Sequence, residues 1–117
     1  MASLFLTVLS ATKVLSPVPG ANPLSYTLTA PLKFKSDLSK ETFTVPAGYV
    51  AYFAQVPKKT YFGPGWERAL VLYDYLRNGK MLPKFKAADI LYEALIADGV
   101  PGLKAGVFWA YVKVFGK

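Results

Sequence analysis

Two aspartates, Asp74 and Asp89, are the residues of this sequence best suited to do chemistry. Asp74 stands in the middle of an apolar run, directly after Tyr73, and Asp89 follows two alanines. A carboxylate in such surroundings must be paired, hydrogen-bonded or metal-bound, because an isolated buried charge is strongly unfavourable. One interpretation is therefore a site for a hard cation or for acid–base catalysis, which carboxylates alone can furnish.

The other interpretation of the two aspartates is structural. Asp74 would accept a hydrogen bond from a tyrosine hydroxyl or from loop N–H groups, and Asp89 would favour the dipole in the first turn of a helix. For the catalytic interpretation, two antiparallel helices with a short connection would have to bring both carboxylates to one seam. We expect the structural role, because no strong base lies nearby in the sequence.

The composition excludes many other chemistries. The 117 residues include no cysteine and no histidine. Disulfides, thiol nucleophiles, thiolate zinc sites, histidine metal ligands and histidine relays are therefore excluded. Seven carboxylates and the tyrosines remain for proton transfer or metal binding. We expect no cofactor, and the only metal-site candidates are Asp74 and Asp89.

The net charge of +7 and the isoelectric point of about 9.6 would suit an acidic partner. The lysines stand in small groups rather than in one basic tract, and no nucleic-acid-binding motif accompanies them. We therefore expect a solvated basic face, with nucleic-acid contact as a secondary role at most.

The apolar run near the N-terminus, Leu4 to Leu9, is short, and no lysine or arginine precedes it. These features favour a first strand, Ser3 to Leu9, over a signal peptide. No stretch reaches the roughly 18 uninterrupted apolar residues that a membrane span needs.

Residues 1–57 alternate between apolar and polar positions with the period of a β-strand. A strand is expected from Ser25 to Lys35, and Pro31 within it predicts either an edge strand or a bend between two strands. Further strands are expected at 41–45, with Phe43 and Val45 inward, and at 49–56, after a turn at 46–48.

Residues 64–115 follow the period of an α-helix. The pattern predicts a helix from Trp66 that ends at Asn78-Gly79 in a left-handed cap. A second helix is expected from about Pro83 or Lys84 to Ala97, stopping at Gly99, and a third from Pro101. The whole chain is thus predicted to be one α+β domain, in which N-terminal antiparallel strands precede three helices packed on the sheet.

Four separated words in residues 43–117 resemble a small phage and prophage family, domain-of-unknown-function family 1353. They are VPAGYVAYFAQVP, RALVLYDYL, AADILYEAL and a closing segment that ends at VKVFG. The resemblance makes residues 43–117 the family-like core and leaves residues 1–42 as a strand-rich N-terminal part. Residues 1–42 would either complete the domain's own sheet or form an extended arm.

The resemblance implies a polar cluster that this chain has partly lost. Where family members carry an aspartate, a serine and a histidine, this chain has Tyr52, Gln55 and Tyr73, whereas Asp74 and Asp89 persist. A tyrosine with a pKa near 10 is a poor general base at neutral pH, where a histidine would titrate. We therefore interpret the five positions as a degenerate site and expect no catalytic residue.

The resulting hypothesis is a non-catalytic phage structural protein, a tail, neck or capsid accessory component present in multiple copies. It would contact other phage structural proteins, in the virion or in the host cytoplasm during assembly. Tyr61, Phe62 and Trp109 are the candidate interface residues. The alternatives are a cell-envelope hydrolase-like protein with a divalent cation at Asp74 and Asp89, and a basic accessory protein that contacts nucleic acid.

Overall fold

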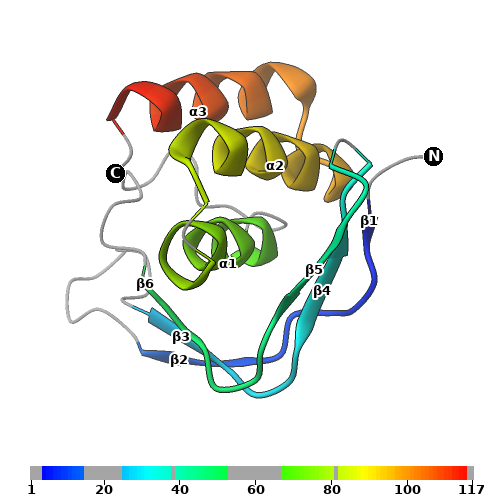
Figure 1. Cartoon of the computed structure of the whole chain (residues 1–117), viewed down its shortest axis with the longest axis vertical. Coiled ribbons are helices and arrows are strands. Elements are labelled where there is room, and N and C mark those ends of the chain that lie inside the picture. The colour runs from blue at the N-terminus through cyan, green and yellow to red at the C-terminus, as the bar shows by residue number, and fades with distance from the viewer. Residues whose placement is uncertain (1–3, 15–24, 38, 53–66, 81, 116–117) are drawn as a thin grey trace.

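The computed structural model describes residues 4–14, 25–37, 39–52, 67–80 and 82–115. In these residues, six short strands precede three helices (Figure 1). The strands are β1 (Leu4–Phe5), β2 (Ala11–Val14), β3 (Ser25–Leu28), β4 (Leu32–Lys35), β5 (Thr42–Val45) and β6 (Val50–Tyr52). The helices are α1 (Glu67–Asp74), which continues into a π-helical turn, η1 (Tyr75–Gly79), then α2 (Lys84–Ala97) and α3 (Gly102–Phe115). The predicted α+β class is confirmed.

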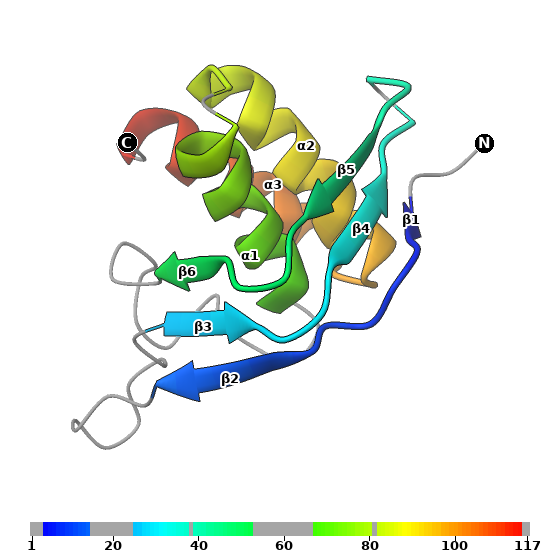
Figure 2. The same cartoon turned by 60° about the horizontal axis from the view of Figure 1, so that its bottom comes forward.

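The strands form two antiparallel three-stranded sheets, in the orders β1-β4-β5 and β2-β3-β6. The segments β1–β2, β3–β4 and β5–β6 each contribute a strand to both sheets. Each segment bends between the sheets, so the sheets together make one folded surface (Figure 2). At the bend, the Leu28 N–H donates to the Tyr49 carbonyl at 2.9 Å, and the Gly48 N–H donates to the Leu28 carbonyl at 2.7 Å. Gly48 has φ 88°, a conformation that glycine adopts without steric cost.

Of the two alternatives predicted from Pro31, an edge strand or two strands divided by a bend, the structure shows the second, with a bend between β3 and β4. Proline has no N–H to donate to a ladder, and here it lies in the gap between the two sheets. The alternation then continues on both sides, with Leu28, Leu32 and Phe34 buried and Lys33 exposed. The predicted inward positions, Phe43 and Val45, are also buried.

The prediction of one strand from Ser3 to Leu9 is wrong. Of its described residues, only Leu4 and Phe5 pair with β4, and a second strand, 11–14, pairs with β3. The chain leaves the ladder at Thr7, whose hydroxyl oxygen accepts a hydrogen bond from the Lys33 N–H at 3.0 Å. The described residues of the N-terminal part thus pair within the chain's own sheets.

The first helix ends differently from the prediction. Gly79 closes a π-helical turn, in which the Lys80 N–H donates to the Tyr75 carbonyl at 2.8 Å, and it does not adopt the left-handed conformation. A Cβ atom at Gly79 would stand 2.5 Å from Cδ1 of Tyr75. The glycine is therefore required because the Tyr75 ring lies against it.

The second helix ends as predicted, at Ala97, with Gly99 in the left-handed conformation at φ 86°. The Gly99 N–H donates to the Ile96 carbonyl, and the Val100 N–H donates to the Leu95 carbonyl, each at 3.0 Å. This is the pair of hydrogen bonds of a Schellman motif. It reverses the chain and directs α3 back along α2.

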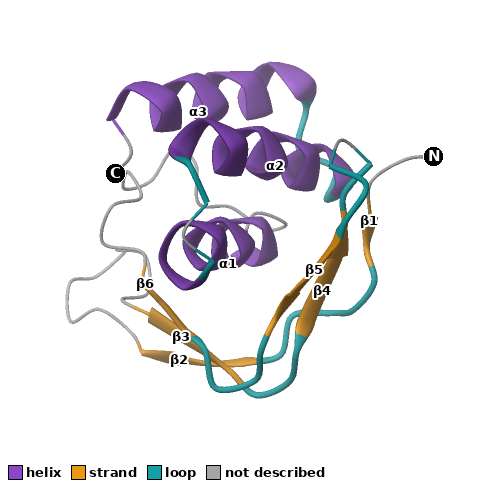
Figure 3. Cartoon of the chain, viewed as in Figure 1, coloured by secondary structure: helices purple, strands orange, loops and turns teal. Residues whose placement is uncertain are grey.

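The helices stack in layers over the folded sheet surface (Figures 1 and 3). Helix α1 lies in the hollow between the sheets and α2, and four consecutive residues of it, 69–72, are buried. Helix α3 packs against α2 and forms the outermost layer. Among the described helices, none is both long and apolar enough to cross a membrane.

Candidate functional site

Both oxygens of the Asp74 carboxylate accept hydrogen bonds from the protein. Asp74 is the last residue of α1, and the Tyr49 hydroxyl donates to its Oδ2 at 2.5 Å. The Asn78 side-chain amide, one turn further on, donates to Oδ1 at 3.2 Å. The Tyr49 ring meets the Tyr75 ring edge to face, with centroids 5.3 Å apart. The predicted bond to a tyrosine is therefore present, and its donor comes from the turn before β6.

The Tyr49 hydroxyl is a stable donor. Burial, together with its hydrogen bond to the Asp74 carboxylate, raises the pKa of Tyr49 well above its ordinary value near 10. Ionisation would place a second negative charge beside Asp74. The Tyr49 phenol is therefore neutral across the neutral pH range and cannot serve there as a base.

Tyr73 stands at the position where the family resemblance implies a histidine. Its hydroxyl is buried and has no hydrogen-bond partner among the described residues. Burial raises the pKa of Tyr73, although the nearby Arg77 opposes the shift. Adjacent side chains of a helix point in directions about 100° apart, so Tyr73 and Asp74 face different surroundings.

The other residues of the predicted degenerate site are only partly placed. Tyr52 ends β6, where its backbone pairs with Ser25, and β6 packs beside α1. Gln55 lies outside the described residues, as do the interface candidates Tyr61 and Phe62.

Asp89 is held by α3 and not by α1. The indole N–H of Trp109 donates to Oδ1 of Asp89 at 2.8 Å, and Nζ of Lys113 lies 3.5 Å from the same oxygen. The Lys113 ammonium also stands 4.0 Å from the centroid of the Trp109 ring, within the range of a cation–π interaction. Asp89 lies beyond the first turn of α2, so the predicted first-turn role is wrong.

The structure therefore does not join Asp74 and Asp89 in one seam. Asp74 is bonded from the sheet side and from its own helix, whereas Asp89 is bonded from the outermost helix. Within the described ranges, no three side chains of the kinds that bind metals are grouped.

Asp89 and Trp109 do share a groove between α2 and α3. It has a volume of about 620 Å³ and is lined by Asp89, Tyr92, Glu93, Gly106 and Trp109. The Tyr92 and Trp109 rings meet at a centroid distance of 6.4 Å, and Trp109 is half-buried. The groove thus brings together a site candidate and an interface candidate that are 20 residues apart in the sequence.

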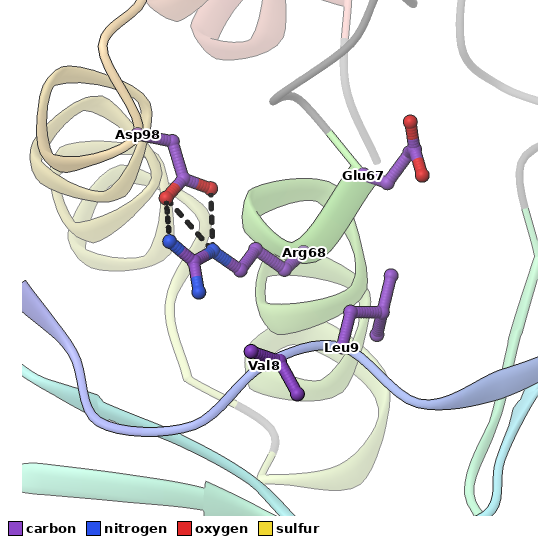
Figure 4. A pocket seen from close by; sticks show the side chains of 5 residues that line it. All are labelled: Val8, Leu9, Glu67, Arg68 and Asp98. Carbon is purple, nitrogen blue, oxygen red and sulfur yellow. Dashed lines mark hydrogen bonds and ion pairs between the residues drawn. The ribbon is translucent and has the colours of Figure 1, made fainter.

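A second pocket, of about 300 Å³, lies where the N-terminal segment crosses α1 and the end of α2 (Figure 4). Its main feature is an ion pair in which Nε of Arg68 donates to both oxygens of Asp98, at 2.8 and 2.9 Å. The Asp98 side chain is 3% exposed and that of Arg68 is 30% exposed. Sequence reasoning missed this pair, although an arginine at the start of an apolar helix indicates a buried acidic partner.

Arg68 also binds the N-terminal segment. Its Nη1 donates to the Thr7 carbonyl at 3.1 Å, and its guanidinium stands 4.4 Å from the centroid of the Phe5 ring. Figure 4 shows the Arg68 side chain reaching from α1 towards Asp98, with Val8 and Leu9 beside it. The Arg68 side chain therefore links three parts of the chain: α1, the end of α2 and the N-terminal segment.

Glu67 lines the same pocket, next to Arg68. Burial, with a further contribution from the Glu67 carboxylate, raises the pKa of Tyr26 to about 12. The pKa values of Tyr26, Tyr49 and Tyr73 are thus all raised, which moves them further from neutral pH.

A family model described as "Protein of unknown function (DUF1353)" matches residues 26–112. The match begins in β3, earlier than residue 43, from which the sequence words indicated the resemblance. No curated protein and no solved structure matches the chain.

Proposed function

This chain belongs to the DUF1353 family of proteins of unknown function, and from that premise we propose that it is a non-catalytic phage protein that acts through protein–protein contacts. It would be a tail, neck or capsid accessory component, present in multiple copies. The phage setting is the one that the family resemblance implies.

The observation that carries the proposal is how the two candidate carboxylates are used. Tyr49 and Asn78 donate to Asp74, and Trp109 and Lys113 hold Asp89. A catalytic base needs a lone pair that faces the substrate, and a metal ligand needs neighbouring oxygens that converge on one point. Carboxylates that hold together elements of their own fold meet neither need.

The upward shifts of the tyrosine pKa values support the same conclusion. Burial moves the pKa of Tyr49 and of Tyr73 further from neutrality, so neither residue is a base near pH 7. Tyr73 therefore does not replace the titrating histidine that the family pattern implies.

The test is quantitative mass spectrometry of purified particles of the phage or induced prophage that encodes the chain. We expect the chain in a fixed ratio to the major capsid protein, and the ratio would separate a capsid-wide component from a tail or neck ring. Absence from particles that contain the other structural proteins would overturn the proposal.

The hydrolase alternative requires a divalent cation at Asp74 and Asp89, and it can be tested on the pure protein. If calcium or magnesium binds the folded state, a free ion concentration of 100 times the Kd would add about 2.7 kcal/mol to the free energy of unfolding. We expect neither ion to change the melting temperature. A rise that disappears in Asp74→Asn would favour the hydrolase instead.

A further inference from the structure

The groove between α2 and α3 combines the volume of a ligand site with an aromatic and acidic lining. Its volume of about 620 Å³ falls within the usual range of small-molecule sites, about 300–1,000 Å³. Asp89 and Glu93 stand one helical turn apart on α2, and Tyr92 and Trp109 supply two aromatic rings. Large rings with a few polar groups beside them are the usual lining of such sites.

The charged groups around the groove oppose one another. Lys113 lies 3.5 Å from Oδ1 of Asp89, and the Ser36 hydroxyl donates to Glu93 at 2.8 Å. A cationic ligand would meet Lys113 and a chain with a net charge of +7, whereas an anionic ligand would meet the two carboxylates. The groove therefore favours a ligand without net charge.

Asp89 can still accept hydrogen bonds from a ligand. Its Oδ1 is held by the Trp109 indole and by Lys113, but no described residue donates to its Oδ2, and its side chain is 41% exposed. A ligand that covered this oxygen without donating to it would leave an acceptor unsatisfied, which is unfavourable. The ligand must therefore donate hydrogen bonds as well as fill apolar space.

The two rings of the groove form a corner. Their planes are inclined at 66°, and their centroids lie 6.4 Å apart. Parallel rings would sandwich a flat heterocycle, whereas inclined rings suit a thicker ring. A pyranose offers such a ring, because its C–H groups can pack on an aromatic face while the hydroxyls around its edge donate hydrogen bonds. Gly106, between the two aromatic residues in the lining, adds no side chain to this corner.

We propose that the groove between α2 and α3 is a binding site for a neutral sugar. The sugar ring lies against Tyr92 and Trp109, and its hydroxyls donate to Asp89 and Glu93. The inference goes beyond the proposed function and does not depend on it, because the groove belongs to the chain itself and not to an assembly. It adds a ligand class to Trp109, which sequence reasoning gave only as an interface candidate.

The test uses three neutral trisaccharides, chitotriose, cellotriose and maltotriose, on the full chain. Choline and adenosine are the probes for a cation and for a flat base. Two-dimensional ¹H–¹⁵N NMR follows the indole N–H signal of Trp109, which Trp109→Phe assigns. Because this N–H donates to Asp89, its signal reports on a ligand at that carboxylate. We expect at least one trisaccharide to shift the signal to saturation, and neither choline nor adenosine to do so.

Gly106→Leu is the variant that fills the groove. A Cβ at Gly106 would have only Cε2 of Tyr92, at 3.9 Å, as a contact outside its own helix, so the added side chain fits and occupies the groove. Gly102→Leu makes the same change at the first residue of α3, outside the lining. Leucine favours a helix more than glycine does, so both variants should fold. We expect Gly106→Leu to weaken sugar binding by about tenfold or more and Gly102→Leu to leave it unchanged.

Tyr92→Ala is a second variant of the lining, and it should also weaken sugar binding, because it removes one wall of the corner. Circular dichroism checks that each variant is folded. If Gly106→Leu does not fold, Tyr92→Ala decides the matter alone.

Three results would overturn the inference. The first is that none of the three trisaccharides shifts the Trp109 signal. The second is binding of a trisaccharide that the folded lining variants leave unchanged, which would place the sugar elsewhere. The third is a stronger response to choline or to adenosine than to every sugar, which would assign the groove to a cation or to a flat base. These results do not depend on particle composition, so a chain that is missing from particles but binds a sugar would contradict only the proposed function.

Discussion

The hydrogen bond from Tyr49 gives the Asp74 carboxylate a donor from within the fold. Asp74 lies at the end of an apolar helix, and without donors its carboxylate would be costly there. Tyr49 supplies a hydroxyl together with an aromatic ring that packs on Tyr75. One tyrosine thereby satisfies the charge and fills the space between the sheet and α1.

Replacing Tyr49 with phenylalanine should keep the packing and remove only the hydroxyl. Tyr49→Phe would leave one oxygen of the half-buried Asp74 without this donor, which we expect to lower the free energy of unfolding by about 1–3 kcal/mol. Urea denaturation, with an unchanged m-value, is the measurement. Tyr92→Phe, at an exposed tyrosine of α2, is the control. Equal midpoints for the two variants would contradict the structural role of the hydroxyl.

Tyr26 provides a prediction about alkaline pH. Its pKa is raised to about 12 in the folded protein, whereas an unfolded tyrosine titrates near 10. Above pH 10 the unfolded chain therefore releases this proton first, and stability that is fully present below pH 10 is lost as the pH rises towards 12. Tyr26→Phe should lose less stability over this interval than the wild type. Parallel curves for the two proteins, from denaturant titrations at each pH, would refute the assignment.

At the scale of elements, two glycines end helices by different means. Gly99 is needed for its backbone, because it has φ 86° and nothing lies within 4 Å of the place of its Cβ. Gly79 is needed for space, because a Cβ would meet the Tyr75 ring. The π-helical turn also places Asn78 within reach of Asp74. Turns of this kind often occur at functional sites, and here the turn orients the Asn78 amide that donates to Asp74.

Alanine at these two glycines should separate the two causes. Gly99→Ala should cost about 1–2 kcal/mol, the price of a left-handed residue with a Cβ. Gly79→Ala should cost about 1–3 kcal/mol through overpacking, because Tyr75 must move. Tyr75→Ala would remove the ring, so Gly79→Ala should cost less in that background, whereas Gly99→Ala should not. Thermal or urea denaturation of the single and double variants gives these differences. Equal coupling of both glycines to Tyr75 would show that the Tyr75 ring is not the reason for Gly79.

At the scale of the whole molecule, the Arg68–Asp98 ion pair joins parts of the chain that are distant in sequence. Through one side chain, α1 is bonded to the end of α2 and to the N-terminal segment at Thr7. Asp98 also lies at the point where the chain reverses from α2 into α3. The same ion pair therefore ties α1 and the N-terminal segment to the turn that leads into α3.

Removing the arginine should be more harmful than removing both charges. Arg68→Met leaves the carboxylate of Asp98, 3% exposed, without its cation, and breaking such a pair costs about 3–5 kcal/mol. The double variant Arg68→Met, Asp98→Asn should recover part of this loss, because no buried charge remains. A double-mutant cycle by urea denaturation measures the coupling. Simple additivity of the two single variants would mean that the ion pair carries no stability.

The sequence alone determined the α+β class, with strands before three helices, and several of the element boundaries. The alternation around Phe43 and Val45, the break at Pro31 and the cap at Gly99 each depend on a few neighbouring residues, and all three agree with the structure. Predictions from the sequence were less reliable where one residue type can have two different structural roles. Gly79 has the residue type of a left-handed cap but was required by contact with the Tyr75 ring.

Only the tertiary structure decided which side chains meet. It assigned Tyr49 to Asp74, Trp109 to Asp89 and Arg68 to Asp98, across separations of 25, 20 and 30 residues. It also separated the two aspartates that a helical hairpin could have joined. The physical reason is that a period along the chain fixes the direction of a side chain on its own element, whereas its partner depends on how the elements pack and bend.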